Sequence, residues 1–205
     1  MKFVKNDIQN VSEFGSIERE LYRDIEIIDF LDYPDSPYFD YSGYDIDRFK
    51  LKSDGVNEAT REEREKVLKK YLNVAKLNYS LSSNIEDQIA VCIHEAIRNA
   101  QKHGNKLDSS KKIGVGIKLN SNDYLEMFVE DSGGQIKSDF FPYRQVILKS
   151  KYENLPYPSF YNFLETDSPK GHSGIGTRII HEFSDSVSYH KSELGGLLVR
   201  MGFKF

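Results

Sequence analysis

The 205-residue chain has a single cysteine and no tryptophan. One cysteine excludes an intrachain disulfide, and the place of Cys92 among apolar residues suits packing in a reducing compartment. No apolar run is long enough to span a bilayer, and the N-terminus lacks the form of a signal peptide. The formal charge of −4 has both signs interspersed, which gives no sign of a nucleic-acid partner. These absences predict a cytoplasmic protein without a membrane or nucleic-acid partner.

The length suits one domain of ordinary size with a short N-terminal extension. Residues 1–21 are polar and weakly patterned, which predicts an arm, and residues 22–205 form the single domain. Within it, residues 24–33 predict a strand. Residues 34–56 are dense in Tyr, Asp, Pro and Gly and predict a long connection. The simplest interpretation of this Tyr-rich insertion is that its tyrosines pack on the edge of a sheet.

The remaining elements follow from periodicity and turn residues. Helical spacing predicts one helix over 57–79 and another over 83–105. Alternation predicts strands over 113–119, 124–130, 185–191 and 197–205, paired as two hairpins. Residues 137–170 have no clean period and carry four prolines, which favours a loop or lid. Together these elements predict an α+β fold: a two-layer sandwich with a mixed, mostly antiparallel sheet and helices on one face.

The helix over 83–105 carries the first functional signal. Ser83 and Glu86 fit a capping box, and Gly104 provides a stop. Glu95 and Asn99 are four residues apart, so their side chains project together at the edge of the apolar stripe. This pair suits a site, although an ordinary boundary pair is the alternative. The helical wheel places five other polar residues on the opposite, solvated side: Glu86, Asp87, His94, Arg98 and Gln101.

Two further short segments complete a pattern in sequence order. Asp131-x-Gly133 follows a predicted strand, and Gly174-x-Gly176 precedes a predicted helix. Each segment is a weak signal alone, because short glycine patterns occur by chance. A hairpin separates the first two segments and a lid-length stretch separates the last two, and this order makes the combination much more specific.

These segments resemble the GHKL superfamily of ATPases, whose nucleotide fold is of the Bergerat (histidine-kinase-like ATPase) type. HEAIRNAQKHGN is similar to the family's N box, VEDSGGQI to its first glycine box and GHSGIGTRII to its second. The resemblance covers roughly residues 22–205 and is strongest to the anti-sigma-factor serine kinases and the ATPase modules of sensor kinases. Nothing in the sequence resembles the phosphoacceptor helix of a sensor histidine kinase.

The resemblance implies a site for ATP and magnesium. Glu95 would be the general base, and Asn99 would bind Mg²⁺ through its amide oxygen, in keeping with the preference of magnesium for oxygen ligands. Asp131 would accept a hydrogen bond from the adenine amino group, and Gly133 would let the backbone approach the base. The phosphates would contact the helix start after the second glycine box and nearby side chains: Gly174, Gly176, Ser173, Thr177 and His103.

The sequence departs from the family pattern in two places. Gln135 stands where the second glycine of the first box belongs, with Gly134 one place early and Ile136 in register. The last strands also lack the Thr that the family often places beside adenine. Two histidines have alternative interpretations: His103 with Lys102 can compensate the helix dipole, and His172 is more typical of a solvated loop.

The leading functional prediction is a magnesium-dependent serine/threonine protein kinase of the anti-sigma type. Its partner would then be a sigma factor or an anti-anti-sigma-like domain, and a homodimer is a further possibility. A GHKL ATPase switch is one alternative, in which ATP closes a lid over 137–170 and controls partner binding or dimerisation. An ATP-binding module without turnover is the other, motivated by Gln135.

Overall fold

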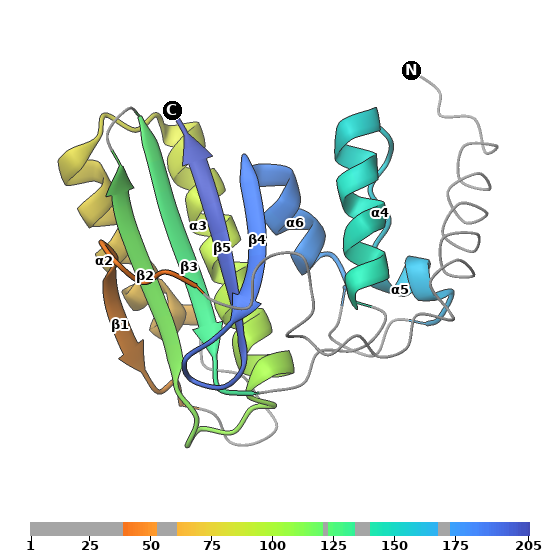
Figure 1. Ribbon diagram of the computed structural model, residues 1–205, viewed down its shortest axis with the longest axis horizontal. Coiled ribbons are helices and arrows are strands. Elements are labelled where there is room, and N and C mark those ends of the chain that lie inside the picture. Colours follow the sequence, from red (N-terminus) through yellow and green to blue (C-terminus); the bar gives the residue numbers. More distant parts are fainter. Residues whose placement is uncertain (1–38, 53–60, 121–122, 134–139, 168–172) are drawn as a thin grey trace.

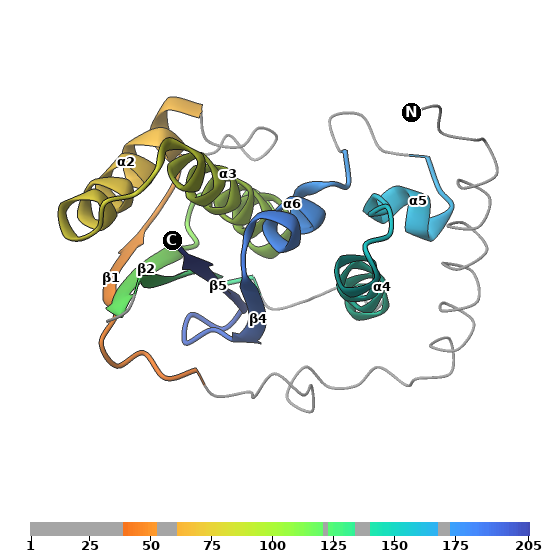
Figure 2. The ribbon, with the colours of Figure 1, turned by 90° about the horizontal axis from the view of Figure 1, so that it is seen from above.

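The computed structural model describes residues 39–52, 61–120, 123–133, 140–167 and 173–205. These residues form a five-stranded sheet with helices on one face, so the predicted two-layer α+β sandwich is confirmed (Figures 1 and 2). The strands are β1 (Asp45–Phe49), β2 (Ile113–Asn120), β3 (Tyr124–Asp131), β4 (Ser186–Lys191) and β5 (Leu197–Lys204). The helices are α2 (Arg61–Asn78), α3 (Ser83–Asn99), its π-helical continuation η2 (Ala100–Gly104), α4 (Phe140–Glu153), α5 (Phe160–Leu164) and α6 (Gly176–Phe183).

The sheet has the strand order β1-β2-β3-β5-β4. Both predicted hairpins are confirmed: Val115 of β2 lies opposite Val129 of β3, and Tyr189 of β4 lies opposite Val199 of β5. The sequence predicts a mixed sheet, but every pair of neighbouring strands within the described residues is antiparallel. The reason is that β5 runs antiparallel to both of its neighbours, β3 and β4.

The main hydrophobic core lies between the inner face of the sheet and helices α2, α3 and α6 (Figure 2). Apolar residues recur every three or four positions in the helices and every second position in the strands, so their side chains all point into this layer. Each fully buried large apolar side chain contributes roughly 1.5–3 kcal/mol. The helices and central strands supply, among others, Leu68, Tyr71, Ala75, Ile89, Cys92, Ile93, Ala96, Leu125, Met127, Met201 and Phe203.

Helix α3 differs from its prediction at both ends. Its N-cap is Ser82, not Ser83, because the Ser82 hydroxyl accepts from the backbone N–H of Ile85 at 3.4 Å. Beyond Asn99 the helix widens into η2, and this wider turn rotates Gln101 out of the predicted solvated side. Gln101 is 3% exposed, and its amide donates to the carbonyl oxygen of Lys52 at 3.4 Å.

The outer face of the sheet, away from the helices, is covered by residues 39–44 (Figure 2). Phe128 of β3 is fully buried there beneath Phe39, Tyr41 and Tyr44, with ring centroids 5.1–5.6 Å away. The predicted long connection therefore contains an edge strand, β1, which pairs with β2. Tyr41 and Tyr44 pack on a face of the sheet and not on its edge. The sequence of β1, DIDRF, is mostly polar and lacks the apolar alternation that predicts a strand.

The stretch predicted over 137–170 as a loop or lid is not a plain loop, because its described part, 140–167, contains α4 and α5. Pro142 lies in the first turn of α4, where no backbone N–H is needed for a helical bond. Tyr143, Ile147 and Phe163 form the centre of a small separate core between these helices. Figure 1 shows α4 and α5 beyond β4 and α6, at one end of the sandwich.

Several predictions fall outside the described residues. They are the arm over 1–21, the strand over 24–33, and the first and last parts of the 34–56 insertion. The helix predicted over 57–79 is confirmed over Arg61–Asn78. Within the described ranges, no helix combines the length and apolar character needed to cross a bilayer.

Gly116 provides a test of the outer face. A Cβ atom on Gly116 would lie 2.2 Å from Cε1 of Phe128. The Phe128 ring is fully buried, so it has little room to move away. We expect Gly116→Ala to lower the free energy of unfolding by about 1–3 kcal/mol, measured by urea denaturation. In the Gly116→Ala background, Phe128→Leu should restore part of that loss, because it removes the clashing ring atoms. Wild-type stability of Gly116→Ala would contradict the packing described.

Candidate functional site

A cavity of about 650 Å³ opens beside the core, where α3 continues into η2. Its walls are α3 and η2, the end of β3, the turn between β4 and β5, the start of α6, and part of α5. The three sequence motifs converge on it. All the predicted site residues except Gly133 line the cavity: Glu95, Asn99, His103, Asp131, Ser173, Gly174, Gly176 and Thr177.

Glu95 and Asn99 face the first turn of α6. A Cβ atom on Gly176 would lie 2.7 Å from Oε2 of Glu95 and 3.2 Å from Nδ2 of Asn99. Glycine therefore lets the start of α6 approach both side chains, whose polar atoms meet the positive end of that helix. The Glu95 side chain is 16% exposed, and Arg98 lies 3.8 Å from its carboxylate.

Asp131 lies at the end of β3 and is 5% exposed. Its carboxylate fits there because the neighbouring residues Gly104 and Gly196 have no side chain. Its Oδ1 accepts from the backbone N–H of Gly133 at 2.8 Å and of Leu197 at 3.4 Å. A Cβ on Gly104 would lie 2.2 Å from the Asp131 carboxyl carbon, and one on Gly196 would lie 2.0 Å from Oδ1. Gly133 packs against the carbonyl oxygen of Gly104, where a Cβ would lie only 1.8 Å away. The backbone therefore surrounds this carboxylate closely.

Burial raises the pKa of Asp131 to about 6, against the opposing effect of the two backbone N–H donors. Desolvation penalises the charged form, so the folded protein holds this proton more tightly than an exposed aspartate does. The group is nevertheless ionised at pH 7 and above. An ionised carboxylate can only accept hydrogen bonds, so Asp131 presents an acceptor to the cavity.

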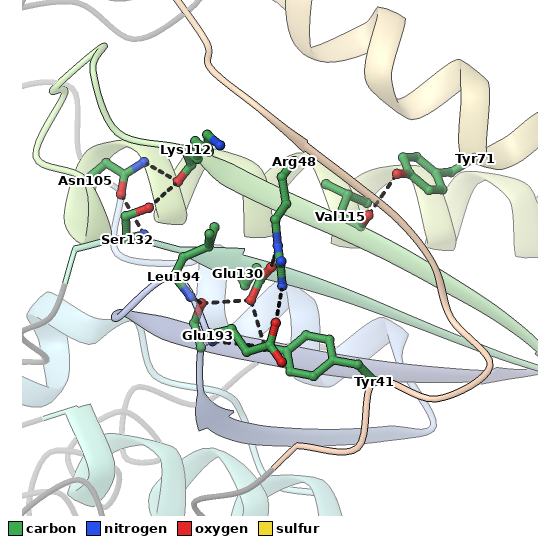
Figure 3. A network of polar contacts seen from close by, with 11 residues as sticks. Tyr41, Arg48, Tyr71, Asn105, Lys112, Val115, Glu130, Ser132, Glu193 and Leu194 are labelled. Atoms are coloured by element: carbon green, nitrogen blue, oxygen red, sulfur yellow. Dashed lines mark hydrogen bonds and ion pairs between the residues drawn. The ribbon is translucent and has the colours of Figure 1, made fainter.

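Asn105 holds the end of η2 against the end of β3 (Figure 3). Its amide donates to the carbonyl of Lys112 at 3.0 Å, and its Oδ1 accepts from the N–H of Ser132 at 2.9 Å. The Ser132 hydroxyl donates to the same Lys112 carbonyl at 2.9 Å. This clamp places Gly104 beside Asp131. The sequence predicts Gly104 as a helix stop, but the contacts of Asn105 depend on strands distant in sequence and have no local signal.

The second glycine segment is fixed to α5. Gly174 has a φ of 68°, and its carbonyl accepts from the N–H of Phe160 at 2.8 Å and the hydroxyl of Tyr143 at 3.3 Å. A Cβ on Gly174 would lie 2.6 Å from the ring of Tyr161. Phe160 and Tyr161 also line the cavity, so α5 contributes both to the wall and to the position of this turn.

Tyr189 of β4 is a lining residue that no sequence motif marks. His181 lies 3.0 Å from its hydroxyl, the Arg144 guanidinium lies 5.0 Å from its ring centroid, and the Phe140 ring lies 5.1 Å away. Burial lowers the pKa of His181 to about 3, so its imidazole is neutral. Other lining residues that the motifs miss are the basic Arg98, Lys102, Lys106 and Lys191, and the apolar Leu197 and Val199.

Five residues of the two glycine boxes cannot be placed in the cavity. Gly134, Gln135, Ile136, Gly171 and His172 lie outside the described residues. The consequence of Gln135 for the first glycine box therefore stays a prediction.

A family model for the histidine kinase-like ATPase domain matches residues 58–203. The chain belongs to this family. It is therefore an ATP-binding domain of the GHKL superfamily, as the motifs and the cavity indicate. A search of curated proteins gives no match.

The raised pKa of Asp131 makes its cost to folding depend on pH. Because the folded pKa (about 6) exceeds the ordinary aspartate pKa of 3.8, the fold favours the protonated form, and stability is lost as pH rises from 3.8 through 6. Asp131→Asn removes this titration. We compare the free energy of unfolding of the variant with that of wild type at two pH values. The variant-minus-wild-type difference should be about 2 kcal/mol more positive at pH 7.5 than at pH 4.5. A difference that does not change with pH, in urea denaturation at both values, would contradict the burial of a titrating Asp131.

Proposed function

We propose that the protein is a magnesium-dependent serine/threonine kinase, which transfers the γ-phosphoryl group of ATP to a hydroxyl of a protein partner. The observation that carries this proposal is the meeting of Glu95 and Asn99 with the glycine start of α6 in one cavity, which Asp131 also lines. A base, a metal ligand and a phosphate-binding turn are the parts that phosphoryl transfer requires, because catalysis there is mainly positioning and charge neutralisation.

Asp131 would bind the adenine end. Its carboxylate can accept a hydrogen bond from the 6-amino group of adenine, whereas guanine presents a carbonyl oxygen at that position and would be repelled. Gly104, Gly133 and Gly196 leave bare backbone around the carboxylate, so a flat base can approach it closely.

The start of α6 would bind the phosphates. Its first N–H groups and the positive end of its dipole favour an anion. Ser173 and Thr177 would add hydroxyl donors, and His103 lines the cavity from η2. Gly174 adopts a left-handed conformation that turns the chain into this position.

Asn99 would hold magnesium through Oδ1. Mg²⁺ takes few protein oxygens and keeps waters and substrate phosphates as its other ligands, and the oxygen donors beside Gly176 fit that requirement. When bound, the metal neutralises charge on the phosphates. Glu95 would accept the proton of the attacking hydroxyl, whose oxygen bonds to the γ-phosphorus while the bond to the β-phosphate oxygen breaks and ADP leaves.

The partner would be a sigma factor or an anti-anti-sigma-like domain with an accessible Ser or Thr. The support is the likeness of the N box, HEAIRNAQKHGN, to that of the anti-sigma kinases, together with the family match. The proteins encoded by neighbouring reading frames are the candidate substrates to assay.

The kinase is tested by comparing two glutamates of α3. Glu95→Gln keeps the size of the side chain but removes the base, so we expect phosphoryl transfer from labelled ATP to fall by about 10²–10⁴ while ATP affinity stays within a few-fold. Glu86→Gln is the matched control, because Glu86 lies on the same helix and pairs with Lys76 outside the cavity. It should transfer phosphate at the wild-type rate.

Failure of wild type to label Ser or Thr on any candidate partner would reject the kinase. Equal loss in both variants would reject Glu95 as the base. Retained ATP affinity with neither transfer nor hydrolysis would identify a binding module without turnover.

An ATPase switch is the second candidate, favoured by the contacts between Gly174 and α5. The carbonyl of Gly174 bonds to Phe160 of α5 and to Tyr143 of α4, and the Tyr143 hydroxyl also bonds to Pro158 just before α5, so a nucleotide that moves this turn also moves α5. We expect ATP to slow hydrogen exchange in α5 of wild type and to slow it less in Tyr143→Phe. Tyr79→Phe, which removes a hydroxyl donor to Asn120 away from the cavity, is the control. Slow hydrolysis without protein labelling, together with this exchange pattern, would select the switch.

A further inference from the structure

Glu130 precedes Asp131 on β3 and points to the opposite, outer face of the sheet. It is fully buried, and three donors enclose its carboxylate (Figure 3). These are Nε of Arg48 at 2.7 Å, the hydroxyl of Tyr41 at 2.8 Å and the hydroxyl of Ser192 at 2.8 Å. Gly114 of β2 makes room for the carboxylate, since a Cβ there would lie 2.4 Å from its Oε1.

Two of these donors also hold the turn between β4 and β5, residues 192–196. The backbone N–H of Glu193 donates to the Tyr41 hydroxyl at 3.1 Å, and the Glu193 carboxylate pairs with Arg48 at 2.8 Å. The Ser192 hydroxyl, besides donating to Glu130, accepts from the N–H of Leu194 at 2.9 Å. The turn is therefore tied to the segment over 39–49 through one buried carboxylate.

The same turn reaches Asp131 on the cavity side. The N–H of Gly196 donates to the carbonyl oxygen of Asp131 at 3.1 Å, and the N–H of Leu197 donates to its carboxylate at 3.4 Å. The turn is closed on itself by the N–H of Ser192, which donates to the carbonyl of Gly196 at 2.9 Å. Gly195, Gly196 and Leu197 line the cavity. One short turn thus contacts the 39–49 segment on one side and the candidate base-binding carboxylate on the other.

We propose that Tyr41 and Arg48 are positioning residues for nucleotide binding: through Glu130 and the 192–196 turn, they hold the wall of the cavity that faces adenine. Both residues precede the family match over 58–203. The proposal rests on the proposed role of Asp131 as the adenine acceptor. Binding linkage is reciprocal, so nucleotide must in turn stabilise docking of the 39–49 segment on the sheet.

The outer face offers a control at a second carboxylate on β3, Glu126, which is partly buried. Glu126 accepts from the hydroxyl of Tyr44 at 2.6 Å and pairs with Arg200 at 2.6 Å. Tyr44 and Tyr41 both pack on Phe128, and each donates its hydroxyl to a glutamate of β3. The Glu126 group contacts neither the 192–196 turn nor the cavity in the described residues. Comparing Tyr41→Phe with Tyr44→Phe therefore distinguishes an effect on the position of the 192–196 turn from a general effect on protein stability.

The test measures the dissociation constants of ATP, ADP and adenosine for wild type and both variants. We expect Tyr41→Phe to weaken all three ligands by about 3–10-fold, because the hydroxyl that joins Glu130 to the backbone N–H of Glu193 in the turn is lost. Tyr44→Phe should leave all three within about 2-fold. The thermal midpoints of the two variants should fall by similar amounts. Inorganic triphosphate, which lacks the base, should bind wild type and Tyr41→Phe alike. Ser192→Ala, which removes the hydroxyl shared by Glu130 and Leu194, should reproduce the Tyr41→Phe effect.

A second readout needs no ligand. Hydrogen exchange at the amides of residues 193–197 should be faster in Tyr41→Phe than in Tyr44→Phe. Equal adenosine affinity in the two variants, with wild type binding normally, would overturn the positioning role and leave the proposed function intact. Failure of wild type to bind adenosine, ADP and ATP would reject the adenine site itself. Weakening of triphosphate by the same factor as adenosine would also overturn the proposal, because it would indicate a general loss of structure.

Discussion

The structure depends on placing a carboxylate, Asp131, almost out of water at the end of a strand. Desolvation opposes this arrangement and raises the pKa of the group to about 6, so the surrounding chain must supply donors at close range. Side chains could not come close enough. Glycine at positions 104, 133 and 196 lets three separate segments bring their backbone to the carboxylate. The end of η2, the end of β3 and the β4–β5 turn are thereby required to meet, and the cavity lies where they do.

One face of the sheet packs against the helices and the cavity, and the other is covered by residues 39–49. Strand β3 contributes side chains to both faces. Odd-numbered residues of this strand, from Leu125 to Val129, pack in the core with the helices, and Asp131 ends this series in the cavity. The even-numbered Glu126, Phe128 and Glu130 face the aromatic and polar cover formed by residues 39–49. Because successive strand residues point to opposite faces, Glu130 and Asp131 place two buried carboxylates back to back. The N-terminal cover and the cavity thus share one strand end and one turn.

Much of the site was accessible from the sequence, because Glu95, Asn99, Asp131, Gly174 and Gly176 carry local signals of spacing and residue type. The helix and hairpin predictions hold because their apolar periodicity matches the core they build. The remaining features depend on contacts between distant segments. β1 is too polar to show a strand pattern, and the prolines around α4 mask its helix. The roles of Asn105, Gly196 and Tyr189 exist only once η2, β4 and β5 are assembled, so no single window of sequence contains them.

The segment that carries Tyr41 and Arg48 has a consequence for how the domain is delimited. The family match begins at residue 58, yet β1 closes the edge of the sheet and Arg48 is the cation beside a fully buried carboxylate. A fragment cut at the family boundary would remove the Tyr41 and Arg48 donors from Glu130, and would bare both the Phe128 ring and the hydrogen-bonding edge of β2. The folding unit of this chain therefore includes residues 39–49 in addition to the homologous region.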